Sequence, residues 1–221
     1  VLAVWAARKH GVPVDGALDL IERRFLATQD AAGGWAYSGD GAMPGSGTPA
    51  MTCAGLLGVA TAIGRREERR QKTETLKTDP APKSTDPFFN PPPRPDGQGS
   101  AGPKRPPDER DTAAARGIHY LGVVLATAGR GAPGGTTDIQ NLYFLWSLER
   151  VGVLYGVDKI GGVDWYAGGA DFLVRTQQGD GTWQGTYGAD VDTSFAVLFL
   201  SKANLARDLS SVEFRPGTRD C

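Results

Sequence analysis

Two stretches of the chain repeat one succession: an amphipathic segment, a glutamine, a glycine-rich turn, a tryptophan and an apolar segment. The first copy places Gln29 and Trp35 six positions apart in QDAAGGW, and the second places Gln177 and Trp183 six apart in QQGDGTW. Because each turn joins an amphipathic segment to a more apolar one, the repeat predicts stacked helical hairpins, in which neighbouring repeats share one core.

The flanking segments show helical periodicity of two kinds. Residues 16–28 place Leu18, Ile21, Phe25 and Leu26 on one stripe, which predicts an amphipathic helix. Similar stripes occur in two further segments, 116–128 and 164–176. The second kind is apolar nearly all round, and its segments are 1–7, 49–64, 137–152 and 192–206. Helices that are apolar on every side are expected to be buried on every side.

The two kinds of helix alternate along the chain, and the sequence holds almost no strand pattern. An open solenoid usually leaves amphipathic helices in both of its layers. Apolar inner helices instead favour a closed ring, so we expect an all-α fold in which alternating inner and outer helices form part of an α/α toroid. Thr48, Thr137 and Asp192 stand at the expected N-cap positions of three apolar helices.

One segment interrupts this pattern. Residues 65–112 are charged and then proline-rich, and prolines at this density exclude a regular helix or a central strand. We expect a disordered insertion between two helical parts, 1–64 and 113–210, with a tail at 211–221. The start of the insertion, RREERRQKTETLK, is expected to extend the preceding helix as a solvated charged stretch. The proline-rich part offers the alternative of a polyproline ligand.

Composition narrows the classes of partner. Lys+Arg 24 against Asp+Glu 25 leaves a net charge of −1, so nucleic acid is not an expected partner. No apolar stretch reaches the roughly 18 residues that a membrane span needs. Cys53, Cys221, His10 and His119 lack the spacing of metal ligands, so we expect neither a metal nor a cofactor. The chain begins at Val1 within a helical pattern, so we expect a piece of a longer protein and predict neither localisation nor oligomeric state.

The repeated turns resemble the QW repeat of the squalene–hopene cyclase and prenyltransferase superfamily. Residues 169–177 lead into Gly181-Thr182-Trp183, which is a close match to that repeat, and residues 25–29 lead into Gly33-Gly34-Trp35, a looser one. The resemblance implies an α/α toroid in which the motif ties outer helices together. A glutamine amide can satisfy backbone groups at helix ends and a tryptophan can cover that pairing. We therefore expect Gln29, Trp35, Gln177, Gly181 and Trp183 to be structural.

The resemblance also directs attention to acidic residues. Cyclases of this family protonate their substrate with the central aspartate of a DxDD motif at the start of an inner helix. The nearest segment here is Ala189-Asp190-Val191-Asp192, in which Asp192 matches the last aspartate and Val191 stands where the proton donor belongs. Asp138, Asp190 and Asp192 remain as candidate acids, with capping and loop roles as the simpler alternative.

A ligand cavity is the second functional hypothesis. Gln140 and Asn141 place polar groups at the mouth of an apolar helix, and Tyr143, Trp146 and Phe195 offer aromatic surface on the inner helices. These residues either line a cavity or fill an ordinary helical core. We expect a binding or scaffold module for an apolar, isoprenoid-like or extended peptide ligand. The alternative is a terpene cyclase whose acid lies upstream of Val1.

Overall fold

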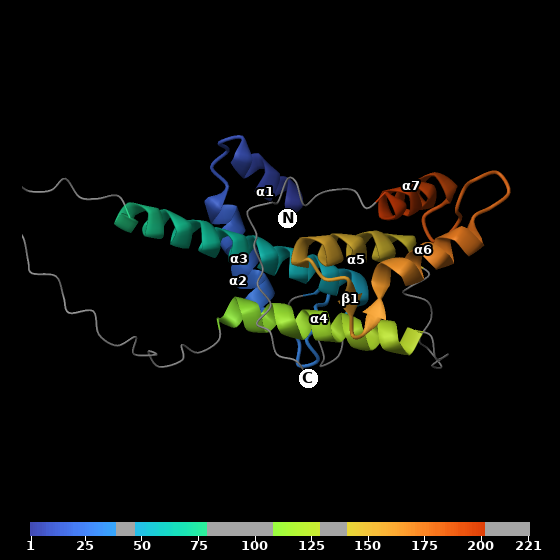
Figure 1. The fold of residues 1–221 in the computed structure, drawn as a ribbon, viewed down its shortest axis with the longest axis horizontal. Coiled ribbons are helices and arrows are strands. Elements are labelled where there is room, and N and C mark those ends of the chain that lie inside the picture. The colour runs from blue at the N-terminus through green and yellow to red at the C-terminus, as the bar shows by residue number, and fades with distance from the viewer. Residues whose placement is uncertain (39–46, 79–107, 129–140, 202–221) are drawn as a thin grey trace, which may run out of the picture.

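The computed structural model describes residues 1–38, 47–78, 108–128 and 141–201, and within them the chain is mostly helical (Figure 1). The strands form one antiparallel hairpin of two residues each. In chain order the elements are α1 (Leu2–Lys9), α2 (Asp15–Ala27), α3 (Pro49–Thr78), α4 (Glu109–Ala128), α5 (Leu142–Tyr155), β1 (Lys159–Ile160), β2 (Val163–Asp164), α6 (Trp165–Thr176) and α7 (Ala189–Leu200). The expected all-α class is confirmed.

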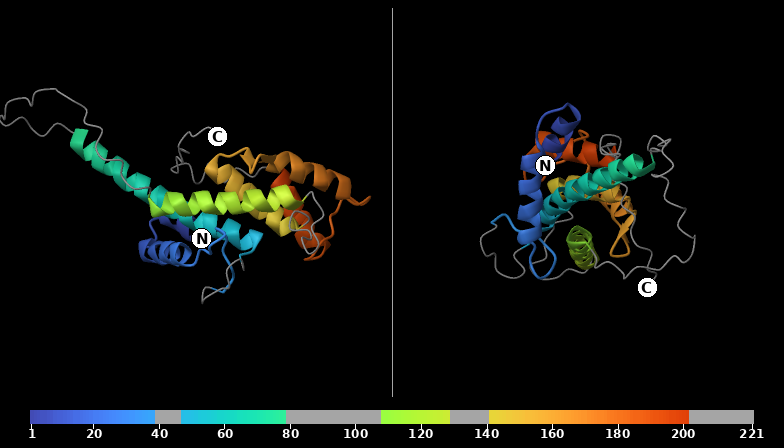
Figure 2. Two further views of the ribbon diagram at one scale, coloured as in Figure 1. Left: turned by 90° about the horizontal axis from the view of Figure 1, so that it is seen from below. Right: turned by 90° about the vertical axis from the view of Figure 1, so that its left-hand side faces the viewer.

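The helices that follow the two tryptophan turns, α3 and α7, lie on either side of α5. α5 packs against both of them, so α3, α5 and α7 are neighbours in that order. α2 and α4 pack on α3, and α6 packs on α5 and α7. α4 runs antiparallel to α3 along much of its length, and Figure 2 shows the same helices from below and from one end. We call α3, α5 and α7 the central row. Each of the three hairpins, α2–α3, α4–α5 and α6–α7, contributes one helix to this row and one helix to its flank.

Local sequence explains where several helices begin and end. The side chains of Thr48, Asn141 and Asp164 accept hydrogen bonds from backbone N–H groups in the first turns of α3, α5 and α6. α5 ends at Gly156, whose φ of 63° is left-handed. The expected N-cap role of Asp192 is wrong. The N-cap of α7 is Gly188, four residues before the expected one, so Asp192 lies inside the first turn.

The core lies around α3 and α5. No described side chain between 49 and 65 or between 142 and 155 is exposed. Glycines permit the closest approaches, because a Cβ built on Gly55 would lie 2.4 Å from the Trp35 ring and one on Gly58 would lie 2.2 Å from Phe25. Burial on every side was expected of all four apolar segments, and it holds for these two only. α1 buries chiefly Trp5, and α7 leaves one side exposed.

The expected insertion at 65–112 is helical at both of its ends. α3 continues through the charged stretch to Thr78, as the sequence predicted for its first part, and α4 begins at Glu109. The remaining part, 79–107, lies outside the described residues, as do Thr137, Asp138, Gln140 and the tail at 211–221. A search of the described helices finds none that is both long and apolar enough to cross a membrane.

Candidate functional site

The first glutamine–tryptophan turn connects α2 with two other helices. The Gln29 amide Nε2 donates to the carbonyl of Gly33 at 3.0 Å and to that of Ala113, in α4, at 2.9 Å. The Trp35 ring is buried and its Nε1 donates to the carbonyl of Phe25 at 2.7 Å. The Trp35 backbone N–H donates to the Thr52 hydroxyl of α3 at 3.2 Å. The motif thus joins α2, α3 and α4, and the Trp35 Nε1 pairs a carbonyl in the last turn of α2.

The second turn repeats this geometry. Gln177 Nε2 donates to Gly181 at 3.0 Å, Trp183 Nε1 donates to the Leu173 carbonyl at 2.8 Å, and the Trp183 N–H donates to the Thr193 hydroxyl at 3.0 Å. Gly33 and Gly181 have left-handed φ values of 94° and 86°. One contact differs, because Gln177 has no counterpart of the bond from Gln29 to α4 within the described part of the chain. Gln29 therefore bonds to a second helix, whereas Gln177 bonds within its own turn only, so the expected tie between helices stays a prediction for the second turn.

Four aromatic rings gather where α5 and α7 begin, and we call Tyr143, Trp146, Tyr187 and Phe195 the aromatic cluster. Phe195 of α7 lies 5.6 Å from Tyr143 and 5.3 Å from Trp146 of α5, measured between ring centroids. Tyr187, in the loop before α7, lies 6.1 Å from both Tyr143 and Phe195. The structure therefore brings together the three aromatic residues that the sequence selected and adds Tyr187, which the sequence reasoning missed.

The surface of the aromatic cluster is partly open. Tyr143, Trp146 and Phe195 are half-buried and Tyr187 is exposed. Burial raises the pKa of the Tyr143 phenol, so this group is neutral at physiological pH. The Arg150 guanidinium lies 3.5 Å from the centre of the Trp146 ring, so one face of that ring already holds a cation. The cluster is thus an aromatic surface with one protein cation at its edge.

Asp192 positions the loop that carries Tyr187. Its side chain is 1% exposed, and its Oδ2 accepts hydrogen bonds from the N–H groups of Gly185 at 2.8 Å and Tyr187 at 3.0 Å. Its other oxygen, Oδ1, is buried and has no hydrogen-bond partner among the described residues. Asp190 is exposed, and Asn141 serves as the N-cap of α5. Of the candidate acids that are described, only Asp192 lies beside the aromatic cluster.

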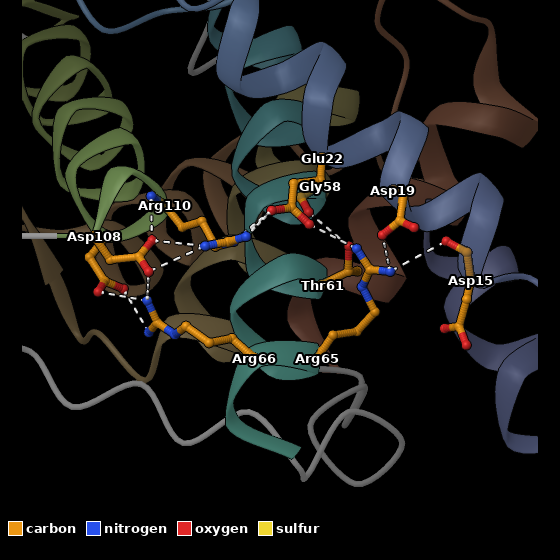
Figure 3. Close-up of polar contacts among 10 residues, drawn as sticks. Asp15, Asp19, Glu22, Gly58, Thr61, Arg65, Arg66, Asp108 and Arg110 are labelled. Carbon is orange, nitrogen blue, oxygen red and sulfur yellow. Dashed lines mark hydrogen bonds and ion pairs between the residues drawn. The ribbon is translucent and has the colours of Figure 1, made fainter. Parts of the chain in front are cut away.

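A network of ion pairs joins α2, α3 and α4, and the sequence did not predict it (Figure 3). The Arg65 side chain is buried and pairs with Asp19 at 2.6 Å and with Glu22 at 2.8 Å. Arg110 of α4 reaches the same Glu22 carboxylate. The hydrogen bond from Arg65 lowers the pKa of Asp19 below its ordinary value of 3.8. Charged residues that the sequence analysis expected to lie in solvent therefore connect α2, α3 and α4.

The same network joins the two helices on either side of residues 79–107. Arg66 of α3 pairs with Asp108 at 3.0 Å and with Asp111, in α4, at 2.9 Å. Bonds to these two carboxylates raise the pKa of the Arg66 guanidinium, so its charge persists at any physiological pH. We assign the network a structural role, because every arginine in it has an acidic partner.

A separate hollow of about 410 Å³ lies at the far end of α5. Its lining residues are Gly152, Val153, Gly156, Val157, Asp158, Trp165 and Ser201. None of the ligand residues selected from the sequence lines it. Among the described residues, no group of three or more His, Cys, Asp or Glu side chains is placed so that it could hold a metal ion. The aromatic cluster is therefore the candidate site that the sequence and the geometry share.

Comparisons of the chain with protein families, with curated proteins and with solved structures give no match in any of the three.

Proposed function

We propose that the chain forms part of an α/α toroid of the squalene–hopene cyclase type and acts as a non-catalytic binding module for an apolar, isoprenoid-like ligand. The observation that carries this proposal is the aromatic cluster. Its rings come from two neighbouring helices of the central row, α5 and α7, and from the loop between α6 and α7, and they leave ring surface open. Open aromatic surface beside a helical core suits an extended apolar chain.

The neighbourhood of Asp192 supports binding rather than proton-initiated catalysis. A cyclase of this type needs a strong acid where this chain has Val191, and the Val191 side chain is exposed. Asp190 also points to solvent, and Asp192 uses Oδ2 to hold the backbone of the Tyr187 loop. In this proposal Asp192 positions a ring of the aromatic cluster and transfers no proton.

One observation favours the alternative, a terpene cyclase. Asp192 is buried beside the aromatic cluster, and its Oδ1 has no hydrogen-bond partner in the described residues. A carboxyl group with one unbonded oxygen near aromatic rings is the arrangement from which a proton donor could be built. In that case the missing central acid would come from a segment outside this chain.

Binding is tested with a single isoprenoid alcohol. We expect geranylgeraniol to bind the full chain in a calorimetric titration and Phe195→Ala to weaken binding about tenfold or more, since burying one phenyl ring is worth about 1.5–3 kcal/mol. Phe172→Ala is the matched control, because Phe172 is also a partly buried phenylalanine but lies on α6, outside the aromatic cluster. Equal losses in the two variants, or no binding by the unmodified chain, would refute the proposed site.

A further inference from the structure

The two tryptophan turns allow the helices that follow them to be compared residue by residue. Thr52 of α3 and Thr193 of α7 are equivalent, because each hydroxyl accepts the backbone N–H of its tryptophan. With these threonines aligned, Leu56 and Leu57 of α3 correspond to Val197 and Leu198 of α7. On the same face, Cys53 and Ala60 correspond to Ser194 and Ser201.

Burial differs sharply between these equivalent positions. Leu56 and Leu57 are 0% and 9% exposed, whereas Val197 and Leu198 are 53% and 37% exposed. Cys53 and Ala60 are buried, whereas Ser194 and Ser201 are exposed. We call Ser194, Val197, Leu198 and Ser201 the open face of α7. Since α3 and α7 both start from the same kind of turn, the difference in burial comes from the segments that pack on each helix.

In the first repeat the cover is the hairpin of α4 and α5. The Tyr155 hydroxyl of α5 donates to the Leu56 carbonyl at 2.8 Å. On α4, Gly117 lies against the side chains of Leu56 and Trp35 so closely that an added Cβ would meet each at 2.8 Å. One hairpin thus buries both the apolar face of α3 and the outer edge of the tryptophan turn.

The polar part of the turn shows the same difference. Gln29 donates to the Ala113 carbonyl of α4, and the backbone of Gly33 is in tight contact with the Arg116 carbonyl. Gln177 donates only within its own turn among the described residues. A Cβ on Gly181, the counterpart of Gly33, would meet nothing nearer than the Gln177 amide at 4.0 Å. A glutamine amide without a bond to a second helix among the described residues and an exposed apolar face therefore occur together, at positions that a hairpin occupies in the first repeat.

We propose that the open face of α7 and the turn from Gln177 to Trp183 form a docking surface for a helical hairpin of the α4–α5 kind. Its outer helix would present a backbone carbonyl to Gln177 and a glycine to Trp183. Its inner helix would cover Val197 and Leu198 with apolar side chains. The proposal rests on the internal repeat alone and is independent of any ligand at the aromatic cluster.

The test extends the full chain after Cys221 with a second copy of its own residues 108–157, which supplies a hairpin of the required kind. We expect amide hydrogen exchange in α7 to slow by about tenfold or more relative to the unextended chain, because a covered helix opens less often. Leu198→Asp in the extended chain should abolish this protection. Leu20→Asp is the matched control, since Leu20 is an exposed leucine on α2.

One further variant and four further outcomes test the proposed docking surface. Gln177→Ala should reduce the protection without disturbing the helix content, which circular dichroism monitors. Unchanged exchange in the extended chain, or equal effects of Leu198→Asp and Leu20→Asp, would overturn the proposal. Slow exchange of α7 in the unextended monomer would also overturn it, because the face would then be covered within one chain. A dimer that sedimentation detects and Leu198→Asp dissociates would assign the face to a second copy instead of a hairpin.

Discussion

Replacing Gln29 by alanine is expected to destabilise the chain more than replacing Gln177 does, although the two glutamines occupy the same position of the same turn. Gln29 is partly buried and donates to two backbone carbonyls, one of which belongs to α4. Gln177 is exposed and donates to one carbonyl in its own turn. The substitution therefore removes a tie between helices at position 29 and only a local turn contact at position 177.

The magnitudes follow from the number and exposure of these hydrogen bonds. Two partly buried bonds at about 0.5–1.5 kcal/mol each predict a loss of about 1–3 kcal/mol for Gln29→Ala. One exposed bond predicts about 0.5 kcal/mol or less for Gln177→Ala. Urea unfolding followed by circular dichroism measures both losses of stability. If the free energy of unfolding falls by about 2 kcal/mol per molar urea, the unfolding midpoint should fall by about 0.5–1.5 M for Gln29→Ala and by about 0.2 M for Gln177→Ala.

Gln178→Ala is the matched control for this pair. Gln178 is an exposed glutamine inside the same turn, and its bonds to Thr182 and Gly181 are made by its backbone, so replacing its side chain should change the free energy of unfolding by less than about 0.5 kcal/mol. A loss at Gln177 equal to or larger than that at Gln29 would contradict the assignment of the Ala113 bond as the tie between α2 and α4.

The remaining predictions concern stability, pH and the aromatic cluster. Trp183→Ala should destabilise the chain by about 3–5 kcal/mol in urea unfolding, as expected for removal of a buried aromatic side chain. Arg65→Ala should cost about 1.5–3 kcal/mol, the value of a hydrogen bond between charged groups, because Glu22 loses its buried partner but keeps Arg110, whereas Arg65→Met should cost less. Because the pKa of Asp19 is lowered in the folded chain, its contribution is present above pH 3.8 and is lost as the pH falls further. Unfolding measured from pH 6 to pH 2 should therefore show a smaller acid effect in Arg65→Met. Asp192→Ala should release the Tyr187 loop and weaken geranylgeraniol binding in calorimetry while leaving the helix content unchanged.

The helical class and the geometry of the two turns could be predicted because both depend on local sequence. Hydrophobic periodicity fixes which segments are helical, and the six-residue spacing from glutamine to tryptophan sets the turn. The glycines at 33 and 181 supply the left-handed backbone that the turn needs. The Gln29 bond to α4 also agrees with the predicted tie between outer helices.

Features that depend on distant segments could not be predicted. Glu22 pairs with Arg65 and Arg110, which lie 43 and 88 positions away, and no spacing rule connects them. The apolar pattern of α7 likewise predicted burial on every side, whereas Val197 and Leu198 are exposed, because burial depends on which distant segments pack there. Placing helix starts from the apolar pattern alone made Asp192 an N-cap, whereas the structure uses it to close a loop.

The aromatic cluster was predicted only in part, because some of its residues follow from local sequence and one depends on a contact elsewhere in the chain. Tyr143, Trp146 and Phe195 could be selected because they stand on apolar helices that the sequence assigned to one layer. Tyr187 was missed because it stands in a loop, and only the backbone bonds to Asp192 bring it to the other rings. An aspartate five residues after a loop tyrosine has no established meaning in a sequence.

The most direct test of the proposed function is to incubate the full chain with squalene, separate the protein by gel filtration and identify the associated lipid by gas chromatography. The proposal predicts unchanged squalene with the unmodified chain and with Phe172→Ala, and much less with Phe195→Ala. A cyclic product that disappears in Asp192→Asn would contradict it and establish Asp192 as a catalytic acid.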